Sequence, residues 1–169
     1  MNSVLKSNLE FLRNSFKRES SVFGLPKALN SLVNVFELNQ PNFAGFLVKP
    51  PERKTIVITT EGQVKPKAPQ YIRVPENILD FPLEAVVHLL KHEFIHVEQR
   101  NRSNYMASRA VREFEAYYRG IYDNNSPIPC PENLKAQFRN SLLKYYHQMT
   151  ESEKAEHVVK FHESQRPKA

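Results

Sequence analysis

The sequence has little cysteine, little glycine and no tryptophan, and these shortages exclude several classes of protein. The single cysteine, Cys130, cannot form an intramolecular disulfide and lies between two prolines, which excludes CxxC zinc ribbons, ferredoxin-type clusters and disulfide mini-folds. With only four glycines, the chain contains neither a P-loop nor a GxGxxG dinucleotide motif. No apolar run approaches the roughly 20 residues of a membrane-spanning helix, so we expect no membrane insertion.

Positive charge is in excess but dispersed. The chain has 24 Lys and Arg against 18 Asp and Glu, a formal net charge of +6. Short basic pairs such as Lys17-Arg18 are typical of solvated helix ends. The chain has no run of five or more basic residues, so nucleic-acid binding is not expected. Charged residues interrupt the first 20 positions, so no secretory signal is expected. Together with the lone cysteine, this favours a cytoplasmic or other reducing compartment.

The length of 169 residues is that of one domain, and most of it has the periodicity of helices. Apolar spacing, capping residues and breakers predict helices over about 4–18, 27–38, 81–102, 108–122, 132–149 and 151–164. Two short runs rich in β-branched residues, 54–60 and 70–74, predict a small antiparallel ribbon, and the Pro/Asn/Gly-rich segment 39–51 predicts a connection. The predicted fold class is therefore helix-rich α+β.

The motif that carries chemistry is His92-Glu93-Phe94-Ile95-His96, on the predicted helix 81–102. Histidines at i and i+4 project from one helix face about one turn apart, so both imidazoles can bind one metal ion. Glu93 follows the first histidine and is placed to take a proton from a water at that ion rather than to bind it. The pattern predicts a catalytic zinc site.

A catalytic zinc site requires a third protein ligand, and the next predicted helix offers two glutamates. Glu115 follows His96 after 18 intervening residues, and Glu113 lies two positions earlier. Two residues on a helix are ~200° apart, so Glu113 and Glu115 cannot both face the ion. Either glutamate is a candidate, and the resemblance to a known family that the x18 spacing carries favours Glu115 over Glu113.

The spacing HExxH-x18-E resembles the gluzincin zinc metallopeptidases, and the segment Glu113-Phe-Glu-Ala116 resembles one that is common among their small members. The resemblance covers residues 54–122. It implies a zincin-like core, with an antiparallel strand before the active-site helix that lines the cleft, a place taken here by Gln70–Val74. The prediction is a single zincin-like domain over 1–169, with extra helices within 4–38 and 132–164.

The resemblance also implies roles for residues around the ion. Gluzincins use a Tyr or His to stabilise the oxyanion, and Tyr118 and Tyr122 lie on the same helix face as Glu115. In the thermolysin branch an aspartate four residues after the ligand glutamate orients the first histidine, but here that position is Arg119. Either tyrosine could instead pack against the active-site helix.

The predicted function is that of a zinc metallopeptidase, with one zinc ion per chain held by His92, His96 and Glu115. Glu93 would act as general base on a peptide or protein substrate. The alternative is a non-catalytic structural or binding protein on a gluzincin scaffold, for example a virion or assembly component, with a structural or occluded metal site. The oligomeric state and the substrate are not encoded in any motif.

Overall fold

The computed structural model describes residues 3–54, 56–62, 68–102, 107–122 and 126–166. Within these ranges it has six α-helices and a small sheet of three strands, which confirms a helix-rich α+β architecture. The elements in chain order are α1 (Ser3–Phe23), α2 (Leu25–Val35), β1 (Phe43–Lys49), β2 (Thr59–Gly62), β3 (Gln70–Pro75), the short 3-10 helix η1 (Ile78–Asp80), α3 (Leu83–Asn101), α4 (Arg109–Tyr122), α5 (Glu132–His147) and α6 (Glu151–Gln165).

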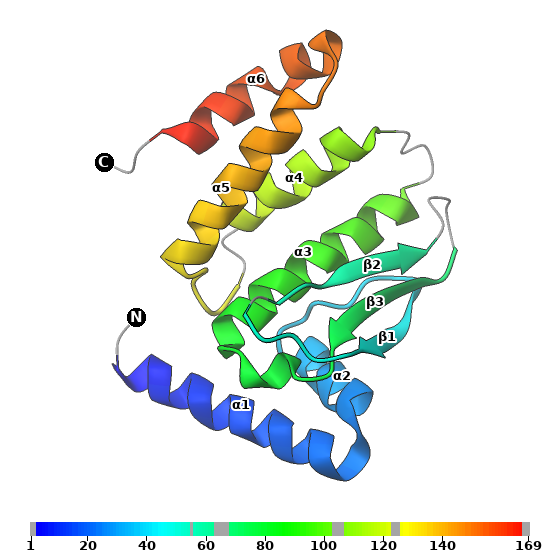
Figure 1. Cartoon of the computed structure of the whole chain (residues 1–169), viewed down its shortest axis with the longest axis vertical. Coiled ribbons are helices and arrows are strands. Elements are labelled where there is room, and N and C mark those ends of the chain that lie inside the picture. The colour runs from blue at the N-terminus through cyan, green and yellow to red at the C-terminus, as the bar shows by residue number, and fades with distance from the viewer. Residues whose placement is uncertain (1–2, 55, 63–67, 103–106, 123–125, 167–169) are drawn as a thin grey trace.

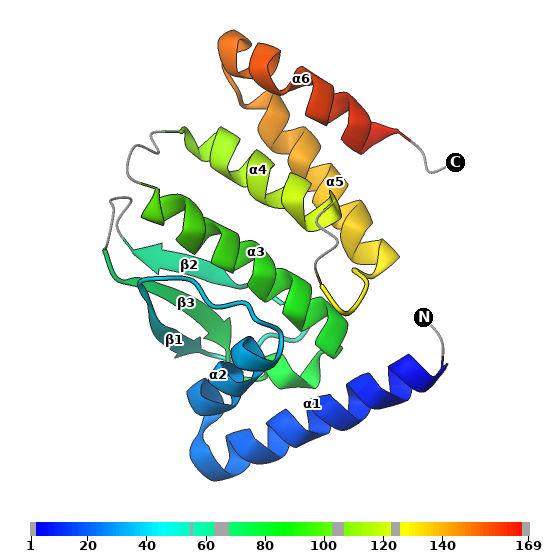
Figure 2. The ribbon, with the colours of Figure 1, turned by 180° about the vertical axis from the view of Figure 1, so that it is seen from behind.

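The elements are stacked along the long axis of the molecule (Figure 1). Helices α5 and α6 lie at one end, followed by α4, α3 and the sheet, and α1 lies at the other end; the view from behind shows the same order (Figure 2). One hydrophobic cluster joins α1, α2, the sheet and α3, and a second joins α4 and α5. The α3–α4 interface therefore lies between two cores.

Helix α3 is buried on nearly all sides, so its polar side chains are buried as well. Twelve of its 19 residues are buried, His92, Glu93, His96 and Gln99 among them. A helix that is covered all round is expected to be central, and α3 lies between the sheet and α4. Polar side chains on such a helix must find partners, because an unpaired buried polar group is costly.

The sheet differs from the predicted ribbon by one strand. Its order is β1-β3-β2, with β3 antiparallel to β2, as expected, and parallel to β1. Strand β1 lies in the segment predicted to be a connection, because Gly45 and the flanking prolines resemble loop signals although residues 43–49 form an apolar run. Strand β3 is central, and its Ile72 and Val74 are fully buried. The strand beside α3 is therefore the edge strand β2, and not residues 70–74, to which the resemblance assigns that place.

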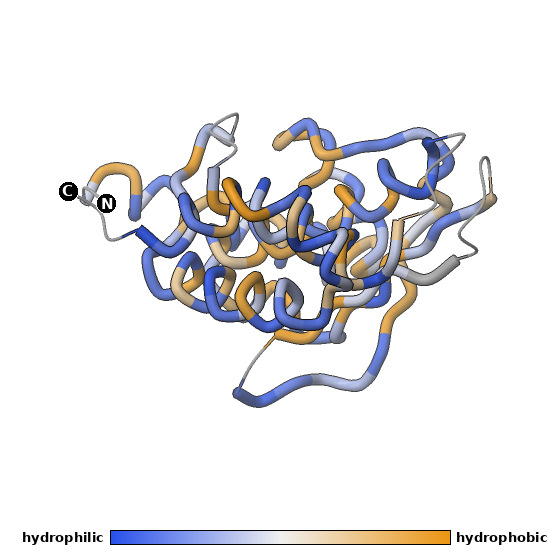
Figure 3. Tube along the Cα trace, turned by 90° about the horizontal axis from the view of Figure 1, so that it is seen from above, coloured by the Kyte–Doolittle hydropathy of each residue, from blue (hydrophilic) through white to orange (hydrophobic). Residues whose placement is uncertain are grey.

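Most predicted helix ends are confirmed within a few residues, and two details stand out. Thr150 and Glu153 form a capping box at the start of α6, which begins at Glu151 as predicted. Helix α3 begins at Leu83, two residues later than predicted, and the preceding Asp80 pairs with Lys17 at 2.8 Å. Hydrophobic and hydrophilic stretches alternate at short intervals along the trace (Figure 3), and none of the helices described is long and apolar enough to cross a membrane.

Candidate metal centre

The two histidines of the motif meet as their spacing predicts. His92 and His96 project from α3 one turn apart, and their Nε2 atoms are 3.2 Å from each other. Both side chains are buried, at 5% and 8% exposure. The predicted convergence of the two imidazoles is therefore present, because helical geometry alone brings i and i+4 side chains together.

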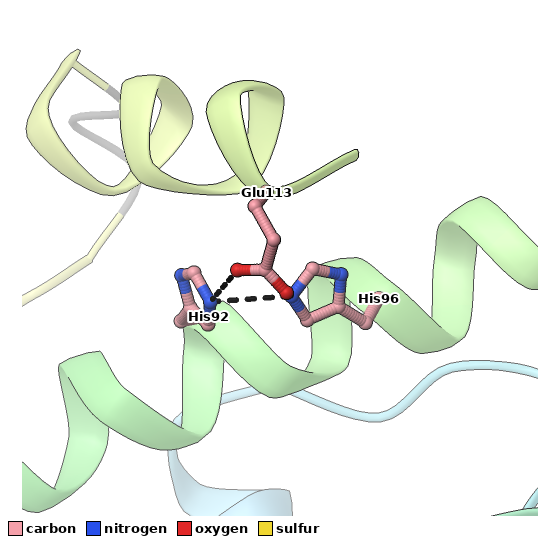
Figure 4. A group of neighbouring side chains, drawn as sticks. All are labelled: His92, His96 and Glu113. Carbon is pink, nitrogen blue, oxygen red and sulfur yellow. Dashed lines mark hydrogen bonds and ion pairs between the residues drawn. The ribbon is translucent and has the colours of Figure 1, made fainter. Parts of the chain in front are cut away.

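Glu113 completes the group from the facing helix. It extends from α4 between the two imidazoles (Figure 4). One carboxylate oxygen lies 3.0 Å from His96 Nε2 and the other 3.5 Å from His92 Nε2. Among the residues that the structure describes, His92, His96 and Glu113 form a group whose donor atoms could hold one metal ion.

The distances are near those of a tetrahedral ion. Bonds of about 2.0–2.1 Å at tetrahedral angles separate neighbouring donor atoms by about 3.3–3.4 Å. The two Nε2 atoms are 3.2 Å apart, and the 3.0 and 3.5 Å separations run to different oxygens of Glu113, so this carboxylate must turn for one oxygen to reach the ion together with both imidazoles. Two imidazoles and one carboxylate are also the ligand set of many catalytic zinc sites.

Glu115, the third ligand favoured by the sequence, is placed elsewhere. Its carboxylate lies 3.0 Å from Arg102 Nη2 and 4.0 Å from Arg119 Nη1. The ~200° between positions two apart on a helix lets Glu113 face the histidines and turns Glu115 toward these arginines. In the structure it is therefore Glu113, the alternative that the sequence left open, that meets the two histidines, because the rotation of α4 about its axis is set by packing and not by spacing.

Gln99 orients one of the two histidines. This fully buried amide donates from Nε2 to the carbonyl of Arg112 at 3.0 Å, so its Oε1 is the acceptor. That oxygen lies 2.9 Å from Nδ1 of His96, which must then carry the proton and donate. The tautomer leaves Nε2 of His96 directed at the centre, and such outer partners are a regular feature of metal-binding histidines.

The other histidine has no such support. Nδ1 of His92 is buried, and no hydrogen-bond partner is found for it in the described parts of the chain. Counted from Glu113 rather than Glu115, the position of the orienting aspartate in the thermolysin branch is Tyr117. Its ring packs against His92 with centroids 4.3 Å apart, so contact with an aromatic ring stands where the resemblance implies a hydrogen bond.

The charge of Glu113 and that of the histidines beside it affect one another's pKa values. Burial works to raise the pKa of Glu113, but hydrogen bonds from His92 and His96 outweigh it and hold that pKa far below its usual range. For His96, burial works to lower the pKa, and the hydrogen bond and charge of Glu113 overcome it, so the pKa is raised. Without an ion, the Glu113 carboxylate is therefore ionised and the protonated form of His96 is favoured, and a cation bound at the group would take the place of that proton.

Glu93 lies beside the group and is held by the edge strand. It is 8% exposed, and the hydroxyl of Thr60 in β2 donates to its Oε2. The same hydroxyl lies 3.2 Å from the backbone carbonyl of Glu93. Glu93 is not part of the three-residue group, which agrees with the prediction that it adjoins the ion without binding it.

Tyr118 and Tyr122 do not reach the centre. Their hydroxyls donate to Glu163 of α6, to the side chain at 2.8 Å and to the backbone carbonyl at 2.9 Å. The tyrosine beside the histidines is Tyr117, which was not among the residues predicted from the sequence. Tyr117 follows Glu113 by four residues and so shares its helix face, but this spacing points to Tyr117 only if Glu113, and not Glu115, faces the histidines. Burial and the charge of Glu113 raise the pKa of Tyr117 to about 12, so the phenol keeps its proton.

The group opens into a cavity of about 370 Å³ between α3, α4, β2 and α5. Thr59 and Thr60 of β2 form one wall, and the metal-site residues and Glu93 form another. His88, one turn before His92, is bound instead to the carbonyl of Ile128 at 2.9 Å and takes no part. The centre is therefore accessible to a small molecule or a polypeptide segment.

Comparisons with known proteins leave the centre to be interpreted from its own geometry. No protein-family model, no curated protein and no solved structure matches this chain.

Proposed function

We propose that the chain is a zinc-dependent peptidase in which His92, His96 and Glu113 hold one zinc ion and Glu93 is the general base. The observation that carries this proposal is the convergence of three metal-binding side chains on the wall of a cavity that also contains a buried carboxylate. Two imidazoles and one carboxylate favour zinc over the larger oxygen-preferring cations. The HExxH motif supports the same function, whereas the x18 spacing of the gluzincin resemblance belongs to Glu115, and Glu113 follows His96 after only 16 residues.

When bound at three protein ligands, zinc lowers the pKa of water toward ~7 and polarises a carbonyl oxygen. Glu93 then accepts a proton from the attacking water and returns it to the leaving amine. Thr60 holds Oε2 of Glu93, which orients the carboxylate and leaves Oε1 for the transfer. Tyr117 keeps its phenolic proton and can donate it as a hydrogen bond to the oxyanion, the role expected of Tyr118 or Tyr122.

The edge strand supports a peptide as substrate. Strand β2 pairs with β3 on one side only, and its Thr59 and Thr60 line the cavity beside Glu93. An edge strand presents unpaired backbone groups to which an extended peptide can hydrogen-bond. A peptide laid along β2 would carry its backbone carbonyls past the metal-binding side chains.

The decisive experiment is the Glu93→Gln substitution in the full chain loaded with zinc. The amide keeps the size of the side chain but cannot accept the proton, so cleavage of a mixed peptide library should fall by about 10²–10⁴-fold while zinc content and melting temperature stay the same. Glu84→Gln, the same change on the same helix away from the cavity, is the matched control. If the wild-type chain holds zinc and cleaves no peptide, the metal is structural and the binding-protein function replaces the peptidase.

A further inference from the structure

Three arginines line the cavity on one side of the metal-binding group. Arg100 comes from the end of α3, and Arg109 and Arg112 come from the first turn of α4. Arg100 and Arg112 are half-buried, and Arg109 is exposed. No sequence pattern singles out these three arginines, because they are spread over 13 positions and meet only when α3 and α4 pack.

The hydrogen bonds recorded for these guanidinium groups do not neutralise them. Arg100 donates to the side-chain oxygen of Gln70 at 2.9 Å, and Arg112 donates to the carbonyl of Ala107 at 2.6 Å. Arg109 lies 6.0 Å from the ring centroid of Tyr145. Within the described ranges, none of the three has a carboxylate oxygen within 4.0 Å.

The arginines on the outer side of the same helix pair are different. Arg102 and Arg119 lie 2.8 Å from opposite oxygens of Glu98, and Arg102 also pairs with Glu115. Among the described residues, α3 and α4 therefore place carboxylates at ion-pair distance from the two outer arginines, but none at that distance from the three arginines of the cavity. Burial and the nearby charge of Arg112 lower the pKa of Arg100, against the charges of Glu93 and Glu113, which act to raise it.

The opposite side of the centre is more apolar. A second hollow shares Ile58, His92, Glu93 and Tyr117 with the first, and beyond them it is lined by Ile56, Val57, Leu89 and Phe138 together with the polar Gln137 and Ser141. The metal-binding group thus lies between a basic half and an apolar half of one cleft. An extended substrate that crosses the centre must place one side of its reacting bond in each half.

We propose that the basic half is a specificity subsite for a carboxylate of the substrate, bound by Arg100, Arg109 and Arg112, while the apolar half takes an apolar residue on the other side of the reacting bond. The proposal rests on the peptidase function and names its substrate class, peptides with an acidic group close to the cleaved bond. Guanidinium groups match carboxylates with paired hydrogen bonds, and a bound carboxylate would compensate the positive charge of these three arginines.

The helix geometry limits where the carboxylate lies. Arg100 follows His96 by four residues, which is an axial rise of about 6 Å. An extended peptide advances about 3.3 Å per residue, so the acidic group lies about two residues from the reacting carbonyl. It can be an Asp or Glu side chain or the terminal carboxylate of the peptide.

The test uses zinc-loaded full-length protein and matched peptides that differ by Glu or Gln at each of the two positions on either side of an apolar–apolar bond. A further pair, with a free or amidated terminus, separates the two sources of carboxylate. We expect kcat/KM to favour the acidic peptide by about 10-fold to 100-fold on one side of the bond only. Arg109→Gln should reduce that ratio and is expected to fold because the side chain is exposed; Arg112→Lys keeps the charge but loses the paired geometry.

Arg119→Gln is the control, since it removes the same charge from the same helix outside the cavity and should leave the ratio unchanged. Cleavage without acidic preference, or with a preference that Arg109→Gln and Arg112→Lys do not alter, overturns the subsite and leaves the peptidase standing. If no peptide is cleaved, the fluorescence anisotropy of the same labelled peptides measures binding alone. Arg-dependent binding of the acidic peptide would then uphold the subsite without the peptidase, and equal binding would overturn both.

Discussion

Two charged clusters join the same helices, α3 and α4, and they use glutamates only two positions apart. On the cavity side, Glu113 meets His92 and His96, all largely withdrawn from solvent. On the outer side, Glu115 and Glu98 meet Arg102 and Arg119, which are about one-third exposed. The first cluster has donor atoms that could hold an ion and lies on a cavity, whereas the second is closed by its own opposite charges. Similar carboxylates thus differ in what they can bind according to the partners that the facing helix presents.

The largest expected difference between the clusters is in metal affinity. Glu113→Ala should weaken zinc binding by more than 100-fold, since loss of a ligand should exceed the 10–100-fold typical of outer-shell partners. Glu115→Ala should leave zinc affinity within a few-fold of the wild type. Competition with a chromogenic chelator measures both, and the reverse ranking would return the ligand role to Glu115.

The tyrosines of α4 give the second contrast. Tyr117→Phe should lower kcat by about 10²-fold with zinc retained, the usual consequence of removing an oxyanion donor. Tyr118→Phe removes only a hydrogen bond to Glu163 and should leave kcat unchanged. Equal rates for the two variants would limit Tyr117 to packing against His92.

The third contrast is between the two histidines. Gln99→Leu removes the acceptor that fixes the tautomer of His96 and should reduce zinc affinity by about 10–100-fold. The substitution also leaves the carbonyl of Arg112 without its donor, so melting temperature must be followed in parallel. A loss of stability with unchanged zinc affinity would mean that Gln99 only joins the two helices.

The outer cluster should affect stability alone, and only modestly. Burial works to raise the pKa of Glu98, but Arg102 and Arg119 outweigh it and the pKa is lowered. The ion pairs therefore stabilise the fold above pH 4.5, the ordinary pKa, and the contribution is lost as the pH falls through the folded-state value. Glu98→Gln should cost about 0.2–1 kcal/mol at pH 7 and progressively less in acid. Urea unfolding at several pH values measures this, and a cost independent of pH would contradict it.

Local patterns predicted what depends on neighbours along the chain. Helical spacing predicted α3 and α4, the capping box predicted the start of α6, and the HExxH motif predicted that His92 and His96 converge. Strand β1 was not predicted because it pairs with β3 in parallel across a long stretch of chain, and because Gly45 is unusual within a strand. The places of Tyr117 and the three cavity arginines were not predicted because they depend on which face of α4 is turned inward.

The sequence by itself therefore determined the helix-rich class, the two histidines and the glutamate between them, since the period of a helix fixes those relations within one turn. Only the tertiary structure brought Glu113 rather than Glu115 to the histidines, placed Tyr118 and Tyr122 against α6, and gathered Arg100, Arg109 and Arg112 in one cavity. The physical reason is the rotation of α4 about its axis. The packing of Phe114 and Ile121 in the α4–α5 core sets it, and spacing along the chain carries no information about it.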